Sequence, residues 1–346
     1  MKSFKTFLFL FFLLLSSTGC GDLLYLSRLG WHQGYISFHS VPVEELLKDE
    51  ETSPLTKEKI RFIQEVKRYG EERFGLRKTG NYLKFFEVKG PVLNVITASE
   101  RDRLQLYSWD FPIVGKVTYK SFFTEGEALK EKRFLERKGY DTFLQQAAAY
   151  STLGWLKDPI FSSMLEWNES TLTNIILHEM THATIYFKDL TDFNEQLATF
   201  VGNQGTIDFL TERYGPGSKE VREALVSQED DLLFSRWTDQ ACQQLSAYYS
   251  KEIPREDKLR GREALFRSIQ TSFQKVKERF KTTSYQDVEK VDLNNAVLLA
   301  YRRYSCRLEK FEALYQSLGR DLRRVIEYFK KIKATDNQMV LSSFLE

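Results

Sequence analysis

Residues 178–205 read HEMTHATIYFKDLTDFNEQLATFVGNQG and contain two of the four histidines in the sequence. His178 and His182 are four residues apart, so on a helix both imidazoles would lie on one face and could bind one zinc ion. The apolar residues around this pair recur at helical intervals, at Leu172, Ile175, Ile176, Ala183 and Tyr186. The spacing therefore predicts a helix that carries a His-Glu-x-x-His motif.

Glu179 lies between the two histidines and on the same apolar stripe of the predicted helix. A carboxylate that faces a core is costly unless it has a partner or a function, and in this motif it is the general base of a metallopeptidase. With four histidines and 48 acidic residues in 346, the pattern arises by chance in fewer than about 1 in 100 such chains. A surface helix with two solvated histidines is the alternative, but it leaves the apolar flank unexplained.

A third metal ligand is needed, because a catalytic zinc has three protein ligands and one open position. His32 and His39 lie far upstream, so Glu195 is the candidate. If residues 188–192 form the turn of a helical hairpin, His182 lies about 7.5 Å before the turn and Glu195 about 4.5 Å beyond it. Asp192 and Glu195 also fit a capping box, and both interpretations can hold at once.

The first twenty residues have the layout of a secretory signal. Lys2 and Lys5 precede an apolar run over 7–15, and small residues lead to Cys20. The run is too short to span a bilayer, and Gly19-Cys20 resembles the lipobox of bacterial lipoproteins. We therefore expect residues 1–19 to be a lipoprotein signal peptide and Cys20 to be acylated, anchoring the chain in the cell envelope, facing the periplasm or the exterior. An ordinary cleaved signal and an uncleaved anchor are the alternatives.

Composition narrows the functional classes. The chain has 50 Lys and Arg against 48 Asp and Glu, which argues against a nucleic-acid partner. A mean hydropathy of −0.41 excludes a polytopic membrane protein. Three cysteines are too few for a disulfide scaffold, although an oxidising compartment would permit one bond between Cys242 and Cys306.

The order of predicted elements is α, then β, then a long α block, which indicates an α+β, helix-rich fold. We expect one domain over 20–346, with its helical part from about 218. The individual expectations are a loop at 49–57, helices at 59–74 and 124–139, strands at 88–97 and 104–117, and a strand with a turn at 144–156.

The segment 178–205 resembles the core of the bacterial predicted-aminopeptidase lipoproteins, a gluzincin-like zinc metallopeptidase family. Further resemblance lies in GWHQGYISFHSVPVEELL, WDFPIVGKVTYKSFF, AYSTLGWLKDPIFSSML and LNNAVLLAYRRY, so it covers nearly all of the chain after residue 20. It implies a zincin-like core with a small β-sheet, one zinc held by His178, His182 and Glu195, and a catalytic Glu179. Thr199 stands where thermolysin-type enzymes have Asp, which leaves the residue that orients His182 unidentified.

The sequence thus predicts a lipid-anchored zinc metallopeptidase of the aminopeptidase type that acts on short peptides and contacts the membrane through its N-terminal lipid. A non-catalytic lipoprotein with a structural or partner-binding zinc hairpin and a zinc endopeptidase are the alternatives. Tyr119 and Tyr304 are candidates for stabilising the oxyanion of the reaction.

Overall fold

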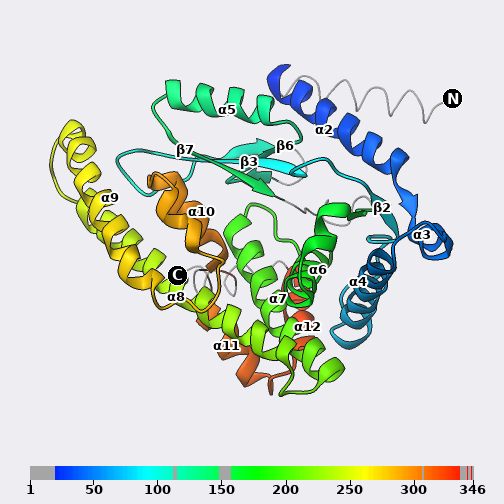
Figure 1. The fold of residues 1–346 in the computed structure, drawn as a ribbon. Coiled ribbons are helices and arrows are strands. Elements are labelled where there is room, and N and C mark those ends of the chain that lie inside the picture. Colours follow the sequence, from blue (N-terminus) through cyan, green and yellow to red (C-terminus); the bar gives the residue numbers. More distant parts are fainter. Residues whose placement is uncertain are drawn as a thin grey trace.

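Helices α6 and α7 form an antiparallel hairpin at the centre of the molecule (Figure 1). The computed structural model describes residues 20–111, 115–147, 157–305 and 308–335, together with 341 and 344. α6 spans Glu169–Thr184 and begins where the Asn168 side chain accepts a hydrogen bond from the Thr171 amide. α7 spans Thr191–Tyr214 and ends at Gly215, whose φ of 88° does not continue a helix.

Small residues let the two helices of this hairpin approach closely. A Cβ atom on Gly202 of α7 would lie 3.0 Å from the backbone oxygen of Asn174 in α6. The Asn174 side chain also donates a hydrogen bond of 2.7 Å to Asn203. The hairpin is therefore held by direct contact between α7 and the backbone of α6.

A three-stranded antiparallel sheet lies over one end of the hairpin, in the order β6–β3–β7 (Figure 1). Its strands are β6 (Lys120–Phe122), β3 (Leu93–Ser99) and β7 (Asp141–Ala147). In the central strand, Val95 pairs with Ser121 on one side and with Gln145 on the other.

Helices cover both faces of this sheet. α5 (Glu125–Arg137) packs on one face and α10 (Asn295–Ser305) on the other. Because side chains alternate along a strand, Ile96 and Ala98 join the apolar cluster under α5, whereas Thr97 faces α10 and contacts its Arg303. The sheet is thus buried on both sides, and α10 connects it to the hairpin below.

The remaining elements surround this centre. The strands are β1 (Val41–Pro42), β2 (Lys84–Phe86) and β8 (Ile160–Phe161) in one sheet, and β4 (Trp109–Phe111) with β5 (Gly115–Val117) in another. The helices are α2 (Cys20–His39), α3 (Val43–Lys48), α4 (Pro54–Arg73), α8 (Lys219–Tyr249), α9 (Arg255–Lys277), α11 (Leu308–Ser317) and α12 (Leu322–Thr335), with 3-10 turns at Ser162–Glu166 and Gln286–Lys290. Among the described residues, no helix is long and apolar enough to cross a membrane.

Besides the apolar cluster under α5, the interior contains a main apolar core around the hairpin and another core around α8 and α9. α8 takes part in both, because Val221 lies in the first and Trp237 in the second. A buried ion pair attaches α9 to the sheet: the Arg262 guanidinium donates two hydrogen bonds of 2.7 Å to the Asp141 carboxylate of β7. The helical C-terminal part is therefore fixed to the sheet by both apolar and ionic contacts.

The α+β, helix-rich fold class is confirmed, as are the helices expected near 59–74 and 124–139 and the helical block after 218. The expected loop at 49–57 is partly wrong, because the Ser53 side chain caps α4 and Pro54 begins it. The strand expected at 88–97 begins only at Leu93. In the described residues of the range 104–117, namely 104–111 and 115–117, the strands are β4 and β5. β7 begins at Asp141, and residues 148–156 lie outside the described part of the chain.

Candidate metal centre

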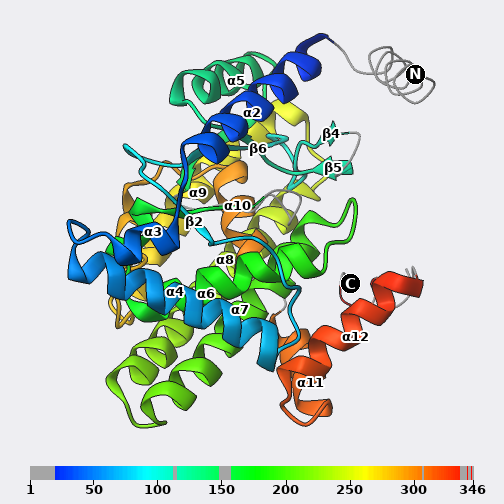
Figure 2. The same cartoon turned by 90° about the vertical axis from the view of Figure 1, so that its right-hand side faces the viewer.

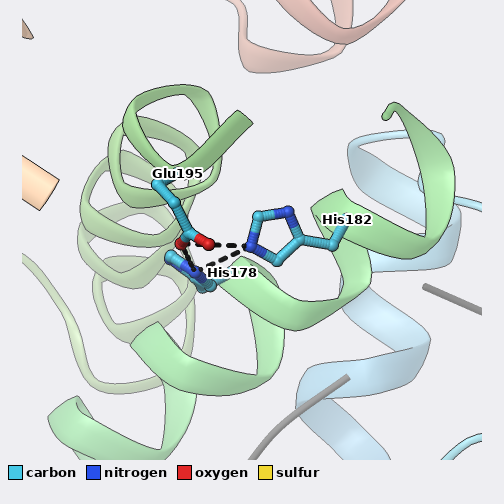
Figure 3. Close-up of side chains that lie close together, drawn as sticks. All are labelled: His178, His182 and Glu195. Atoms are coloured by element: carbon cyan, nitrogen blue, oxygen red, sulfur yellow. Dashed lines mark hydrogen bonds and ion pairs between the residues drawn. The ribbon is translucent and has the colours of Figure 1, made fainter. Parts of the chain in front are cut away.

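Three side chains that could bind a metal meet on the inner side of the α6–α7 hairpin (Figure 3). His178 and His182 come from α6, and Glu195 comes from the first turns of α7. The Glu195 Oε2 atom lies 3.3 Å from His178 Nε2 and 3.4 Å from His182 Nε2, and the two Nε2 atoms are 3.1 Å apart. The residues predicted from the motif and from the hairpin argument are therefore brought together.

The spacing of these atoms fits a tetrahedral ion. Two ligand atoms that each lie about 2.05 Å from one zinc ion, at the tetrahedral angle, are separated by about 3.3 Å. The three observed separations of 3.1, 3.3 and 3.4 Å are close to this value. Two imidazoles and a carboxylate are also a common donor set of catalytic zinc.

The pKa values of these side chains favour a negatively charged Glu195 beside cationic or metal-bound imidazoles. Burial acts to raise the pKa of Glu195, but the imidazoles of His182 and His178 outweigh it and hold this pKa below its usual value. Burial acts to lower the pKa of His182, but the Glu195 carboxylate outweighs it and raises this pKa. The charge of Glu195 is thus stabilised by the two imidazoles beside it when they carry positive charge.

Glu179 lies beside this group without being one of the three ligand side chains. Burial raises the pKa of its carboxyl, Glu195 adds to this, and the two histidines oppose it. Glu179 is only partly buried, and Tyr304 nearby is 41% exposed, with its ring centroid 6.4 Å from that of His178. The side of the site that carries Glu179 is therefore the side that solvent or a substrate can reach.

The turn of the hairpin differs from the sequence expectation. α6 ends at Thr184 and α7 begins at Thr191, so the turn covers 185–190 rather than 188–192. The N-cap of α7 is Leu190, and the capping box of Asp192 with Glu195 is wrong because both residues lie inside the helix. Glu195 is then free of a capping role, and its carboxylate faces the histidines.

Asn194 fixes this turn and is a site residue that the sequence analysis missed. Its Oδ1 atom accepts a hydrogen bond of 2.9 Å from the Phe187 amide, and its Nδ2 atom donates one of 2.7 Å to the Phe187 carbonyl. Asn194 is only 2% exposed, so these bonds are shielded from water. Because Asn194 directly precedes Glu195, the clamp sets where the carboxylate lies.

A second support reaches Glu195 from distant parts of the chain. The Tyr119 hydroxyl, between β5 and β6, donates a hydrogen bond of 3.3 Å to Glu195 Oε1. Burial and the Glu195 charge raise the pKa of Tyr119, so the hydroxyl keeps its proton and remains a donor. Arg303 of α10 is 1% exposed, lies 5.1 Å over the Tyr119 ring and donates a bond of 3.1 Å to the Thr118 carbonyl.

These contacts give different roles to Tyr119 and Tyr304, the two candidates for oxyanion stabilisation. The Tyr119 hydroxyl already donates a hydrogen bond to Glu195, whereas Tyr304 lies at the exposed side of the site. The Nδ1 atom of His182 is buried and has no hydrogen-bond partner among the described residues.

The predicted roles of the three cysteines stay predictions. Cys20 is the first residue of α2, and its acylation stays a prediction, as does the signal at 1–19, which lies outside the described residues. Cys242 is buried in α8, and Cys306 lies outside the described residues, so the disulfide also stays a prediction.

A comparison with protein-family models gives a match over most of the chain. A family model described as "Putative aminopeptidase" covers residues 24–340. Neither the curated proteins nor the solved structures that were compared with the chain gave a match.

Proposed function

Because the chain belongs to the aminopeptidase family whose model covers residues 24–340, and because it brings two histidines and a glutamate together beside Glu179, we propose that it is a zinc-dependent peptidase with a zincin-like core. The observation that carries the proposal is the convergence of His178, His182 and Glu195 at tetrahedral spacing. One zinc per chain is expected there. Family membership supports the peptidase activity, and the donor set supports the metal.

A catalytic role fits this donor set better than a structural one. Structural zinc sites are closed by four protein ligands, whereas catalytic sites keep one position open. Within the described part of the chain, only three side chains of the ligand types group together. The non-catalytic alternative also gives no role to the carboxylate of Glu179 on the open side.

The residues have separate tasks in peptide hydrolysis. A bound zinc would act as a Lewis acid toward the scissile carbonyl and the attacking water. Glu179, on the accessible side, takes the proton of the water and delivers it to the leaving amine. Tyr304, whose ring centroid lies 6.4 Å from that of His178, is the candidate donor to the oxyanion, and Tyr119 donates a hydrogen bond to Glu195.

We further propose that the protein is an aminopeptidase, anchored to a membrane of the cell envelope by lipid on Cys20. The family description supports cleavage at a free N-terminus, and the lipobox-like Gly19-Cys20 supports the anchor. Short peptides are the expected substrates. An endopeptidase with the same metal site would differ in accepting peptides without a free amine.

The test combines metal analysis with peptide digestion. His182→Ala should lose zinc, whereas His39→Ala, at an exposed position on α2, should retain about one zinc per chain. Glu179→Gln should keep the metal but lose about 10²–10⁴-fold in turnover. Equal zinc content in wild type and His182→Ala would refute the metal site, and full activity of zinc-loaded Glu179→Gln would refute the mechanism.

The specificity is tested with matched peptides that differ only in N-terminal acetylation, followed by mass spectrometry. We expect the free peptides to be shortened from the N-terminus and the acetylated ones to be cleaved much more slowly. Internal cleavage at equal rates in both would show an endopeptidase and leave the zinc proposal intact.

A further inference from the structure

Helix α2 carries an aromatic stripe on its outer face. Trp31, Tyr35 and Phe38 follow one another at intervals of four and three residues, so they lie on one side of the helix. Phe38 is 85% and Trp31 77% exposed, the two highest values among the large apolar side chains of the described residues, and Tyr35 is 52% exposed. Figure 2 shows α2 along the outside of the molecule, beside α5.

The opposite face of α2 is fixed to the body of the protein. The Tyr25 hydroxyl donates a hydrogen bond of 2.8 Å to the Ser121 carbonyl of β6, and Ile36 is 5% exposed. Arg28 forms an ion pair of 2.8 Å with Glu127 of α5. The aromatic stripe is therefore held pointing away from the molecule rather than being free to turn inward.

The charge pattern of this segment is unlike the rest of the chain. Residues 23–43 contain no Asp, Glu or Lys and a single Arg, although the 28% charged fraction of the whole chain would give about six charged residues in 21. Solvent-facing helix surfaces normally carry charged side chains. An outer face made of Trp, Tyr and Phe without carboxylates matches instead the headgroup region of a bilayer, where amphipathic aromatic rings are enriched.

A lipid on Cys20 would bring a bilayer close to this face. Cys20 is the first residue of α2, so Trp31 lies about 16 Å and Phe38 about 27 Å farther along the helix axis. A lipid on Cys20 would hold the start of α2 at the membrane surface, and the helix can then lie along it. A protein partner fits less well, because stable interfaces use about 20–30 residues a side and the stripe offers three large rings.

We infer that the outer face of α2 inserts Trp31, Tyr35 and Phe38 into the interfacial region of the membrane. This contact rests on the lipid anchor proposed above and adds to it a second, apolar attachment. Because α2 is bonded to β6 and α5, the contact orients the whole body on the bilayer surface.

The test uses the fluorescence of Trp31 in the full-length chain, reconstituted in vesicles of phosphatidylethanolamine and phosphatidylglycerol that carry brominated acyl chains. Bromine quenches only tryptophan that reaches the lipid. We expect quenching in wild type that is stronger for bromine near the headgroup than near the chain end, and that is lost in Trp31→Phe. Trp31 is largely exposed, so this variant should fold as wild type does.

A matched control places a tryptophan elsewhere on the surface. Leu225 is 41% exposed and belongs to α8, and α8 lies on the other side of the β6–β3–β7 sheet from α2 (Figure 1). The double variant Trp31→Phe, Leu225→Trp should show no quenching by bromine. Equal quenching in wild type and Trp31→Phe, or quenching of the double variant as strong as that of wild type, would overturn the inference.

Mass spectrometry of the N-terminal peptide separates this inference from the anchor. An acylated Cys20 without Trp31-dependent quenching overturns the inference and leaves the anchor intact. Trp31-dependent quenching without an acyl group overturns the anchor and supports the membrane contact. The absence of both overturns both.

Discussion

Replacing Gly202 by alanine tests whether close contact between α6 and α7 sets the geometry of the metal centre. The added Cβ atom would lie 3.0 Å from the Asn174 backbone oxygen and 3.3 Å from its Oδ1 atom, so one helix must move by a few tenths of an ångström. Alanine gains about 1 kcal/mol over glycine through helix propensity. Overpacking of a tight contact costs about 1–3 kcal/mol. We therefore expect Gly202→Ala to lower the free energy of unfolding by about 1 kcal/mol.

The metal site should respond as well, because Asn174 lies one turn before His178 and Gly202 two turns after Glu195. Moving the helices apart would lengthen the distance from the Glu195 carboxylate to the imidazoles, and zinc affinity should fall. The stability assay is urea unfolding of the metal-free protein, followed by zinc titration of the folded variant. Gly126→Ala is the control: nothing lies within 4 Å of its added Cβ, and it should gain about 0.5 kcal/mol. A Gly202→Ala protein as stable as wild type, with unchanged zinc affinity, would refute the reasoning.

Two other changes test the charges in the helical C-terminal part. Arg262→Met should lower the free energy of unfolding in urea by about 3–5 kcal/mol, because it leaves the buried Asp141 carboxylate without its bidentate partner. Adding Asp141→Asn should recover part of this loss. A loss below about 1 kcal/mol in Arg262→Met would contradict the assignment. Burial raises the pKa of Asp231 to about 6, the Tyr285 hydroxyl opposes this and Asp230 adds to it. Since folding raises this pKa, the protonated Asp231 contributes its full stability below pH about 4 and loses it as pH rises through 6. Between pH 4 and 8, the free energy of unfolding of wild type should therefore fall by about 2 kcal/mol more than that of Asp231→Asn. Parallel pH profiles of the two proteins would contradict this.

The three candidate metal ligands could be predicted to lie together because the information is local. The spacing of His178 and His182 places both rings on one helix face, and a hairpin estimate in units of helix rise was enough to select Glu195. The exact turn could not be predicted, since Ile185 and Phe187 continue the apolar pattern of α6. The Asn194 side chain bonds the Phe187 backbone instead, and these two hydrogen bonds compete with continuation of the helix.

The residues that surround the candidate ligands could not be predicted, because they lie far from one another in the sequence. Tyr119 is 76 residues from Glu195, and Arg303 is 206 residues from Thr97. No periodicity in one sequence connects such positions, and 17 tyrosines gave no basis for choosing Tyr119 as the partner of Glu195. The helix α2 was also missed, because glycines at 30 and 34 and a run of aromatic residues give no clear helical period.

All three candidate ligands lie in the α6–α7 hairpin, and this affects the order in which the site can fold. His178 and Glu195 are 17 residues apart, whereas the contact of Arg303 with Thr97 closes a loop of 206 residues, and this difference costs about 2 kcal/mol more in chain entropy. The hairpin can therefore form before β6 and α10 close over Glu195. A chain at that stage would already present all three ligands to a metal ion, yet would lack the hydrogen bond from Tyr119. For the proposed zinc peptidase, metal uptake during refolding should accordingly precede the appearance of activity, and binding of the metal alone should not yield an active enzyme.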